Sequence, residues 1–203
     1  MITQIQKLLP KFREILNAPT LEICLAPEWG STNRDSRLLL RRAIVNELGK
    51  HEPLSEIESE ILLRLEFVPQ PPGASVSISH TQSFGGFAYT RAQAPALGFD
   101  IELTSRIRPK AVERVSEPGE LQNAPGAPHV WVAKEAAFKS MRGAKQPAIL
   151  SSLKTSAWRS VANPENLSLW SCDIREDSLP NASTKGLTVE LSGIALSIFL
   201  HQP

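Results

Sequence analysis

The sequence predicts an α+β protein organised in two halves, residues 1–95 and 96–203. Two observations indicate this class. Apolar residues at helical spacing come first within each half, and segments that alternate apolar and polar residues come last. The chain also contains no Gly-x-Gly-x-x-Gly pattern, which argues against a doubly wound dinucleotide fold. The two halves meet in the turn-like segment 91–96.

Composition limits the classes of partner. The chain has 203 residues, 41% of them hydrophobic, which is enough for a substantial core. Its 22 Lys and Arg against 21 Asp and Glu give a net charge of +1, so there is no bulk attraction to nucleic acid or to an anionic membrane. The N-terminus lacks the apolar run of a signal peptide, and no stretch is apolar enough to span a bilayer. We therefore expect a cytoplasmic protein.

Three helices are predicted in the first half. Apolar residues at helical spacing predict a helix over 2–17, which Pro10 would bend or divide. A second helix begins after a hydroxyl cap at position 31 or 32 and ends at Gly49. The pattern over 55–58 is a capping box, so it begins a third helix.

Strands account for the rest of the first half. The short apolar run 21–26 predicts one strand, and 63–68 is a weaker candidate. Segment 75–79 alternates strictly, which directs its Val and Ile inward and its serines outward. Segment 85–90 is the returning strand of a hairpin.

The second half begins with a strand over 97–103. Pro109 suits the first turn of a helix that continues to about Val115. Residues 117–128 are rich in Pro, Gly and Ala and predict a loop or a ragged short helix, and a longer helix covers 129–142. The remaining strands are predicted over 155–161, 167–174 and 187–200, with turns at Pro164 and at Pro180-Asn181.

Acidic side chains gather in the predicted strand and long helix of the second half. Asp100 and Glu102 share one face of the strand with Gly98, while Glu135 and Lys139 stand one turn apart on the helix. Three carboxylates and an ammonium suit a hard divalent cation such as Mg²⁺ together with a phosphate. Each pattern taken alone also fits a solvated surface.

Basic side chains lie in the first half. Arg34, Arg37 and Arg41 share one edge of the second helix, which is either a solvated basic face or a phosphate site. His80 ends a strand, where it is either a satisfied surface histidine or a donor to a phosphate.

Three blocks resemble, in order, those of the 4′-phosphopantetheinyl transferases: Ser77 to His80, Gly98 to Glu102, and Trp131 to Lys139. With the block Arg37 to Arg41, the chain looks like the larger Sfp-type branch, and the resemblance covers about residues 31–145. It implies the pseudo-dimeric transferase fold, in which two similar halves each pack helices on a small, mainly antiparallel sheet, with coenzyme A between them.

The resemblance implies an enzyme that transfers the 4′-phosphopantetheine group of coenzyme A to a serine of an acyl or peptidyl carrier protein. Asp100, Glu102 and Glu135 would hold Mg²⁺, with Mn²⁺ as an alternative. Glu135 and Lys139 would be catalytic, the first accepting the serine proton and the second stabilising the leaving group. The residues implied to bind coenzyme A are Arg37, Ser79, His80, Lys134 and Lys139. Two fused halves would let a monomer form a whole site.

The chain departs from the family in two places. The Pro-rich loop 69–73 lacks the lysine that the family often carries before its Ser-x-Ser-His block. The segment between Glu102 and Lys134, which contributes to carrier docking in the family, is short. A non-catalytic module that binds coenzyme A or a carrier protein is therefore the alternative function. A metal-dependent phosphohydrolase would need further metal ligands.

Overall fold

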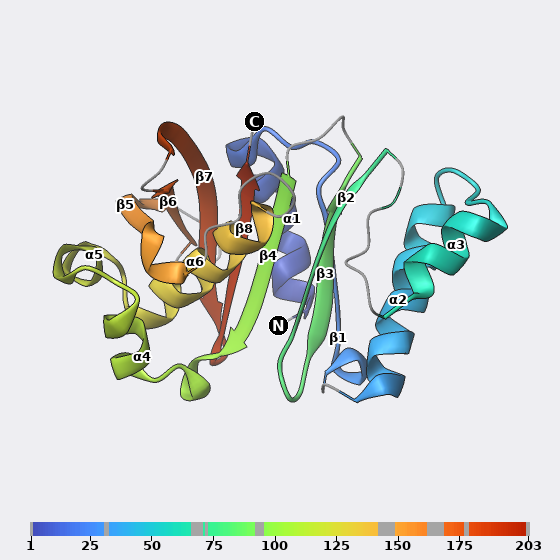
Figure 1. The fold of residues 1–203 in the computed structure, drawn as a ribbon, viewed down its shortest axis with the longest axis horizontal. Coiled ribbons are helices and arrows are strands. Elements are labelled where there is room, and N and C mark those ends of the chain that lie inside the picture. The colour runs from blue at the N-terminus through green and yellow to red at the C-terminus, as the bar shows by residue number, and fades with distance from the viewer. Residues whose placement is uncertain are drawn as a thin grey trace.

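The computed structural model describes residues 2–30, 33–65, 71, 73–91, 96–141, 149–161, 169–176 and 179–201. This part of the chain forms six α-helices and two antiparallel sheets (Figure 1). The predicted α+β class is thus confirmed. The chain forms one sheet before segment 91–96 and the other after it.

The first sheet has the strand order β1-β3-β2. Its strands are β1 (Glu22–Ala26), β2 (Ser75–His80) and β3 (Gly85–Thr90), and all three were predicted. The central strand β3 pairs antiparallel with both neighbours, so β2 is an edge strand.

Two helices, α2 (Arg34–Gly49) and α3 (Glu56–Leu63), share an apolar cluster with β2 and β3. The Asn33 side chain caps α2 by accepting a hydrogen bond from the Ser36 amide at 2.8 Å. The predicted hydroxyl caps at 31 and 32 lie outside the described residues. The capping box at the start of α3 is confirmed. The strand predicted over 63–68 is wrong at its start, because Leu63 still belongs to α3, and residues 66–68 are not described.

The second sheet has the order β4-β8-β7-β6-β5. The single strand predicted over 187–200 is wrong, because the chain reverses at Ser192 and Gly193, whose φ angles are +51° and +78°. The turn predicted at Pro180 falls inside a strand instead. The strands are β4 (Ala96–Leu103), β5 (Leu153–Val161), β6 (Leu169–Glu176), β7 (Leu179–Leu191) and β8 (Ile194–His201).

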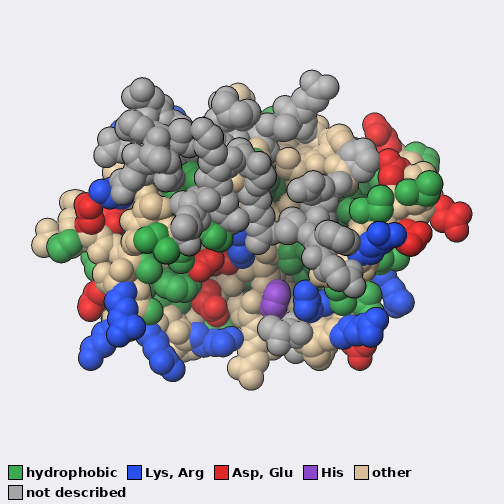
Figure 2. Space-filling view, in the orientation of Figure 1, with side chains coloured by type: hydrophobic (Ala, Val, Ile, Leu, Met, Phe, Trp, Pro, Cys, Tyr) green, Lys and Arg blue, Asp and Glu red, His purple; other side chains and the backbone are tan. Residues whose placement is uncertain are grey.

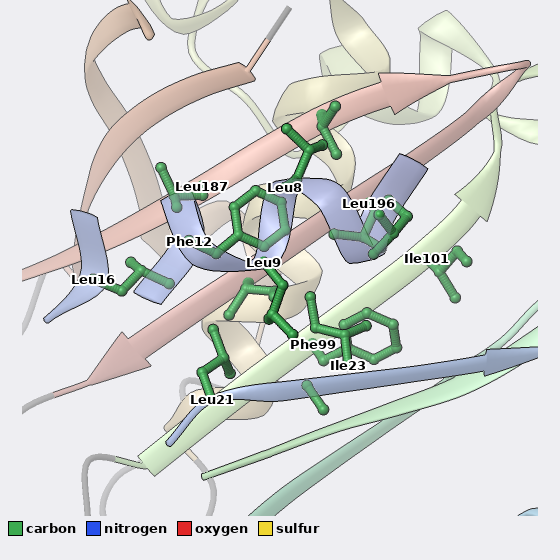
Figure 3. Packing of buried hydrophobic residues seen from close by; sticks show 14 of the residues in the cluster. Leu8, Leu9, Phe12, Leu16, Leu21, Ile23, Phe99, Ile101, Leu187 and Leu196 are labelled. Carbon is green, nitrogen blue, oxygen red and sulfur yellow. The ribbon is translucent and has the colours of Figure 1, made fainter. Parts of the chain in front are cut away.

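Helix α1 (Ile2–Leu16) packs across both sheets. Figure 3 shows its leucines and Phe12 directed at side chains of β1, β4, β7 and β8, and Phe12 is fully buried. Pro10 does not divide the helix, whose apolar stripe is buried on both sides of the proline. The largest core cluster therefore joins residues from both predicted halves.

Three helices follow β4. The first two are α4 (Pro109–Arg114) and α5 (Pro118–Asn123), the second forming where a loop or ragged helix was expected. The third, α6 (Ala127–Ser140), corresponds to the predicted long helix and shares an apolar cluster with β5, β6 and β8. It lies across the face of the second sheet opposite to α1 (Figure 1). No helix in the described ranges is both long and apolar enough to cross a bilayer.

Candidate functional site

Strand β4 presents different residues to its two faces, as its alternation predicted. Phe99 and Ile101 are at most 1% exposed and belong to the core under α1. Gly98 faces α6, and a Cβ atom added there would lie 1.7 Å from the carbonyl oxygen of Ala136. The glycine therefore lets the helix backbone approach the strand.

This close packing brings the end of α6 to the acidic residues of β4. The Lys139 ammonium lies 2.6 Å from Asp100 Oδ1 and 3.2 Å from the Phe99 carbonyl oxygen. Both partners are mostly buried, with side-chain exposures of 13% for Lys139 and 9% for Asp100. Residues 39 positions apart in the chain thus form one charged pair in a partly dehydrated setting, where its electrostatic attraction is less screened than at the surface.

Strand β2 reaches the same pair from the other sheet. The Ser79 hydroxyl donates a hydrogen bond to Asp100 Oδ1 at 2.8 Å. Asp100 therefore receives one bond from α6 and one from β2 on a single oxygen. Residues of all three sequence blocks that carry the family resemblance meet at this carboxylate.

His80 follows Ser79 and is half-buried. Burial lowers the pKa of its imidazole, and the charges of Lys139 and Arg37 lower that pKa further, while Asp100 raises it. The imidazole is therefore neutral at pH 7, with one ring nitrogen as a donor and the other as an acceptor. Its electrostatic surroundings include the predicted phosphate residues Arg37 and Lys139 as well as Asp100.

Arg37 reaches this region from the first sheet's helices. It is exposed on α2, and its guanidinium donates to the Leu65 carbonyl oxygen at 3.4 Å. Arg41, one turn further along the same edge, is buried and donates to the Leu62 carbonyl oxygen at 3.3 Å. Arg41 thus serves to join α2 to α3, and Arg37 is the more accessible of the two to an anion.

The other two predicted metal ligands lie on β4 and α6. Glu102 is partly exposed on β4, where its Oε1 accepts the Leu103 amide at 2.9 Å. Glu135 is partly exposed on α6, one turn before Lys139. Within the described ranges, no three His, Cys, Asp or Glu side chains come together as a metal-binding group. The carboxylate trio is therefore not assembled in this conformation.

The surroundings of Asp100 nevertheless fit a hard cation. The three carboxylates offer only oxygen atoms, the donors that Mg²⁺ and Mn²⁺ prefer. A cation already sits against Asp100, since the Lys139 ammonium fills that position at 2.6 Å. Carboxylates that lie close together repel one another, and the Lys139 ammonium offsets the charge of Asp100 in this structure.

Lys134 is next to Glu135 on α6, and its ammonium bonds to residues that follow β4 in the chain. Its side chain is 0% exposed, and its ammonium lies 3.0 Å from Glu120 and 2.5 Å from the Val115 carbonyl oxygen. Burial lowers the pKa of Lys134, and the pairing with Glu120 opposes that shift. The Lys134 ammonium is thus engaged by Glu120 and Val115 in this structure, and its role in binding coenzyme A stays a prediction.

Glu120 is the residue that the sequence reading missed. Its Oε1 accepts the Thr155 amide at 2.6 Å and the Thr155 hydroxyl at 2.9 Å, so it links α5, α6 and β5. The signal that could have found it is the capping box from Glu117 to Glu120 around Pro118. The same residues border a surface groove of about 480 Å³ between α5 and β5.

Charged side chains of both signs surround a histidine on the face that Figure 2 presents. The histidine is exposed near the centre, acidic side chains lie close to it on the left, and basic side chains lie at the lower left and on the right. Comparison with models of known protein families gave no match, and comparison with curated proteins gave none. The function must therefore be argued from the chemistry of the site itself.

Proposed function

We propose that this protein transfers the 4′-phosphopantetheine group of coenzyme A to a serine of a carrier protein. The observation that supports this proposal is the meeting of Ser79, Lys139 and Asp100 at one carboxylate oxygen. Each comes from a different one of the three blocks that resemble the transferases, and the blocks lie on β2, β4 and α6. The pseudo-dimeric arrangement of that family forms part of the proposal.

The reaction needs positioning and charge neutralisation more than covalent help from the protein. The serine oxygen forms a bond to the phosphorus that carries pantetheine, and the bridging P–O bond to adenosine 3′,5′-bisphosphate breaks. Glu135 takes the serine proton, directly or through water, because its carboxylate lies on α6 one turn from Lys139. Lys139 moves its ammonium from Asp100 to the phosphate oxygens and stabilises the departing charge.

The remaining residues hold the substrate. The neutral His80 donates one ring N–H to a phosphate oxygen, and the exposed Arg37 binds the terminal 3′-phosphate. Asp100, Glu102 and Glu135 would hold Mg²⁺, which supplies charge neutralisation at the pyrophosphate. The exposed basic side chains beyond β4, which we propose face the carrier protein, are Arg106, Arg108, Lys110 and Arg114.

The test is intact-mass spectrometry of apo carrier proteins incubated with this protein, coenzyme A and Mg²⁺. We expect a mass increase of one phosphopantetheinyl group, absent when a chelator replaces Mg²⁺. Lys139→Met should slow transfer by about 100-fold or more, because it removes a cation from the developing charge. Lys154→Met is the matched control, since Lys154 lies on β5 in an ion pair with Glu117, and it should transfer at the wild-type rate. Unmodified carrier proteins with the wild-type protein would refute the proposal.

The competing function is a non-catalytic module that binds coenzyme A. The missing lysine of the Pro-rich loop 69–73 favours it, as does the lack of an assembled group of three metal ligands within the described residues. Calorimetry separates the two functions. A module binds coenzyme A equally well with and without Mg²⁺, whereas the proposed enzyme binds it more tightly when Mg²⁺ is present.

A further inference from the structure

Two serines of β2 join the two sheets through their side chains. Strict alternation predicted that Ser77 and Ser79 face outward, yet they are only 3% and 5% exposed. Ser77 Oγ accepts the Phe99 amide at 2.9 Å, and Ser79 Oγ accepts the Ile101 amide at 3.3 Å. In each pair the two residues are 22 positions apart in the chain, and this equal separation means that β2 and β4 run in the same direction. The hydroxyl oxygens accept amides of β4 in the way that a neighbouring strand's carbonyl groups would.

Ser79 differs from Ser77 in one further bond. Its hydroxyl proton is donated to Asp100 Oδ1 at 2.8 Å, on the oxygen that also binds Lys139. A hydroxyl carries a single proton, so Ser79 has no second donor for a phosphate. A phosphate oxygen offers only lone pairs, and it could bind Ser79 only by breaking the bond to Asp100.

We infer that Ser79 is a positioning residue that orients the Asp100 carboxylate, and that it does not itself bind coenzyme A. This inference rests on the proposed transferase function. It replaces the role in phosphate binding that the resemblance implied for Ser79. Because His80 is next to Ser79 in β2, the same bond also fixes the phosphate-binding histidine relative to the acidic strand across the junction of the sheets.

Unfolding equilibria test the bond without any ligand. A double-mutant cycle combines Ser79→Ala with Asp100→Ala and measures the unfolding equilibrium constant in urea. Hydrogen bonds to charged groups are strong, so we expect a coupling of about tenfold or more in that constant. The matched cycle of Ser77→Ala with Asp100→Ala should be additive within about twofold, because Ser77 bonds only to the backbone. Additivity in both cycles would overturn the inference.

Binding and kinetics then separate positioning from direct contact. For Ser79→Ala we expect coenzyme A affinity, measured by calorimetry with a chelator present, to stay within about twofold of wild type. The kcat for transfer should fall by about tenfold or more, because the Asp100 carboxylate loses the hydrogen bond that fixes its orientation. Ser77→Ala should change neither quantity by more than about threefold. A loss of coenzyme A affinity with kcat unchanged would instead assign Ser79 to the ligand.

Transfer activity and the coupling between Ser79 and Asp100 can be lost independently. If the wild-type protein transfers nothing, the proposed function fails, although the coupling between Ser79 and Asp100 still holds. If transfer occurs without that coupling, the inference alone fails. Should Ser79→Ala be too unstable to measure, Ser79→Cys keeps a similar volume with a weak donor, and we expect it to give a smaller coupling and a smaller loss of kcat.

Discussion

Replacing Gly98 with alanine tests how α6 is held against β4. The added Cβ would lie 1.7 Å from the Ala136 carbonyl oxygen and 2.7 Å from the Ser140 amide nitrogen. Ordinary contact begins near 3.4 Å, so the helix backbone would have to retreat by roughly 1.7 Å. Both atoms that are hit belong to the main chain, so no side chain can rotate away. The Lys139 ammonium would be carried off Asp100, from which it now lies 2.6 Å.

The cost of this substitution can be bounded. Overpacking a tight core costs about 1–3 kcal/mol, and the backbone clash here puts Gly98→Ala at about 3 kcal/mol or more. For a chain of this length that lowers Tm by roughly 6–12 °C. Thermal unfolding followed by circular dichroism measures it. We also expect coenzyme A affinity to fall, because Lys139 and Glu135 move with the helix.

Gly49→Ala is the matched control for this experiment. Gly49 ends α2, and a Cβ added there meets nothing within 4 Å. Its alanine variant should keep or slightly raise stability, by at most about 1 kcal/mol. A Gly98→Ala variant that unfolds within about 2 °C of wild type and binds coenzyme A normally would show that α6 is not held by close packing at Gly98.

Two further predictions concern stability away from Asp100. Lys134→Met should destabilise the fold by about 3–5 kcal/mol in urea, since it leaves the buried Glu120 carboxylate without its charged partner. Lys154→Met removes a partly exposed ion pair and should cost about 1 kcal/mol or less. An equal effect of both lysine substitutions would contradict this reading of the buried pair. Burial lowers the pKa of His129 to about 4. As the pH falls from 6.5 towards 4, this histidine binds a proton in the unfolded chain but stays neutral in the folded chain. The free energy of unfolding should therefore drop by up to about 3 kcal/mol over this range. His129→Asn, which can keep the bond to Thr188, should flatten this loss between pH 7 and pH 4.5, and an unchanged pH dependence would show that another group is responsible.

Local periodicity predicted most of the helices and the two faces of β4. The stripe of α1 and the capping box of α3 are written in neighbouring residues, so both were confirmed. The alternation of Phe99 and Ile101 with Asp100 likewise fixed which side chains enter the core. Where the expected contact was local in the chain, the sequence was sufficient.

Long-range packing accounts for the errors. Ser77 and Ser79 were expected to face outward, because alternation does not reveal that the edge strand of a second sheet lies against them. The pairing of Lys134 with Glu120 was likewise not predicted, because Glu120 lies on a separate short helix. The reversal between β7 and β8 was missed because apolar residues continue on both sides of it, although Gly193 is a turn signal.

Joint measurement of both reaction products tests the central claim most directly. Apo carrier protein, coenzyme A and Mg²⁺ are mixed with the wild-type protein, and holo carrier protein and adenosine 3′,5′-bisphosphate are quantified together. Asp100→Ala is compared with Asp173→Ala, which removes a carboxylate from β6. We predict equal amounts of the two products with wild type and Asp173→Ala, and neither product with a folded Asp100→Ala. Undiminished transfer by Asp100→Ala would contradict the account.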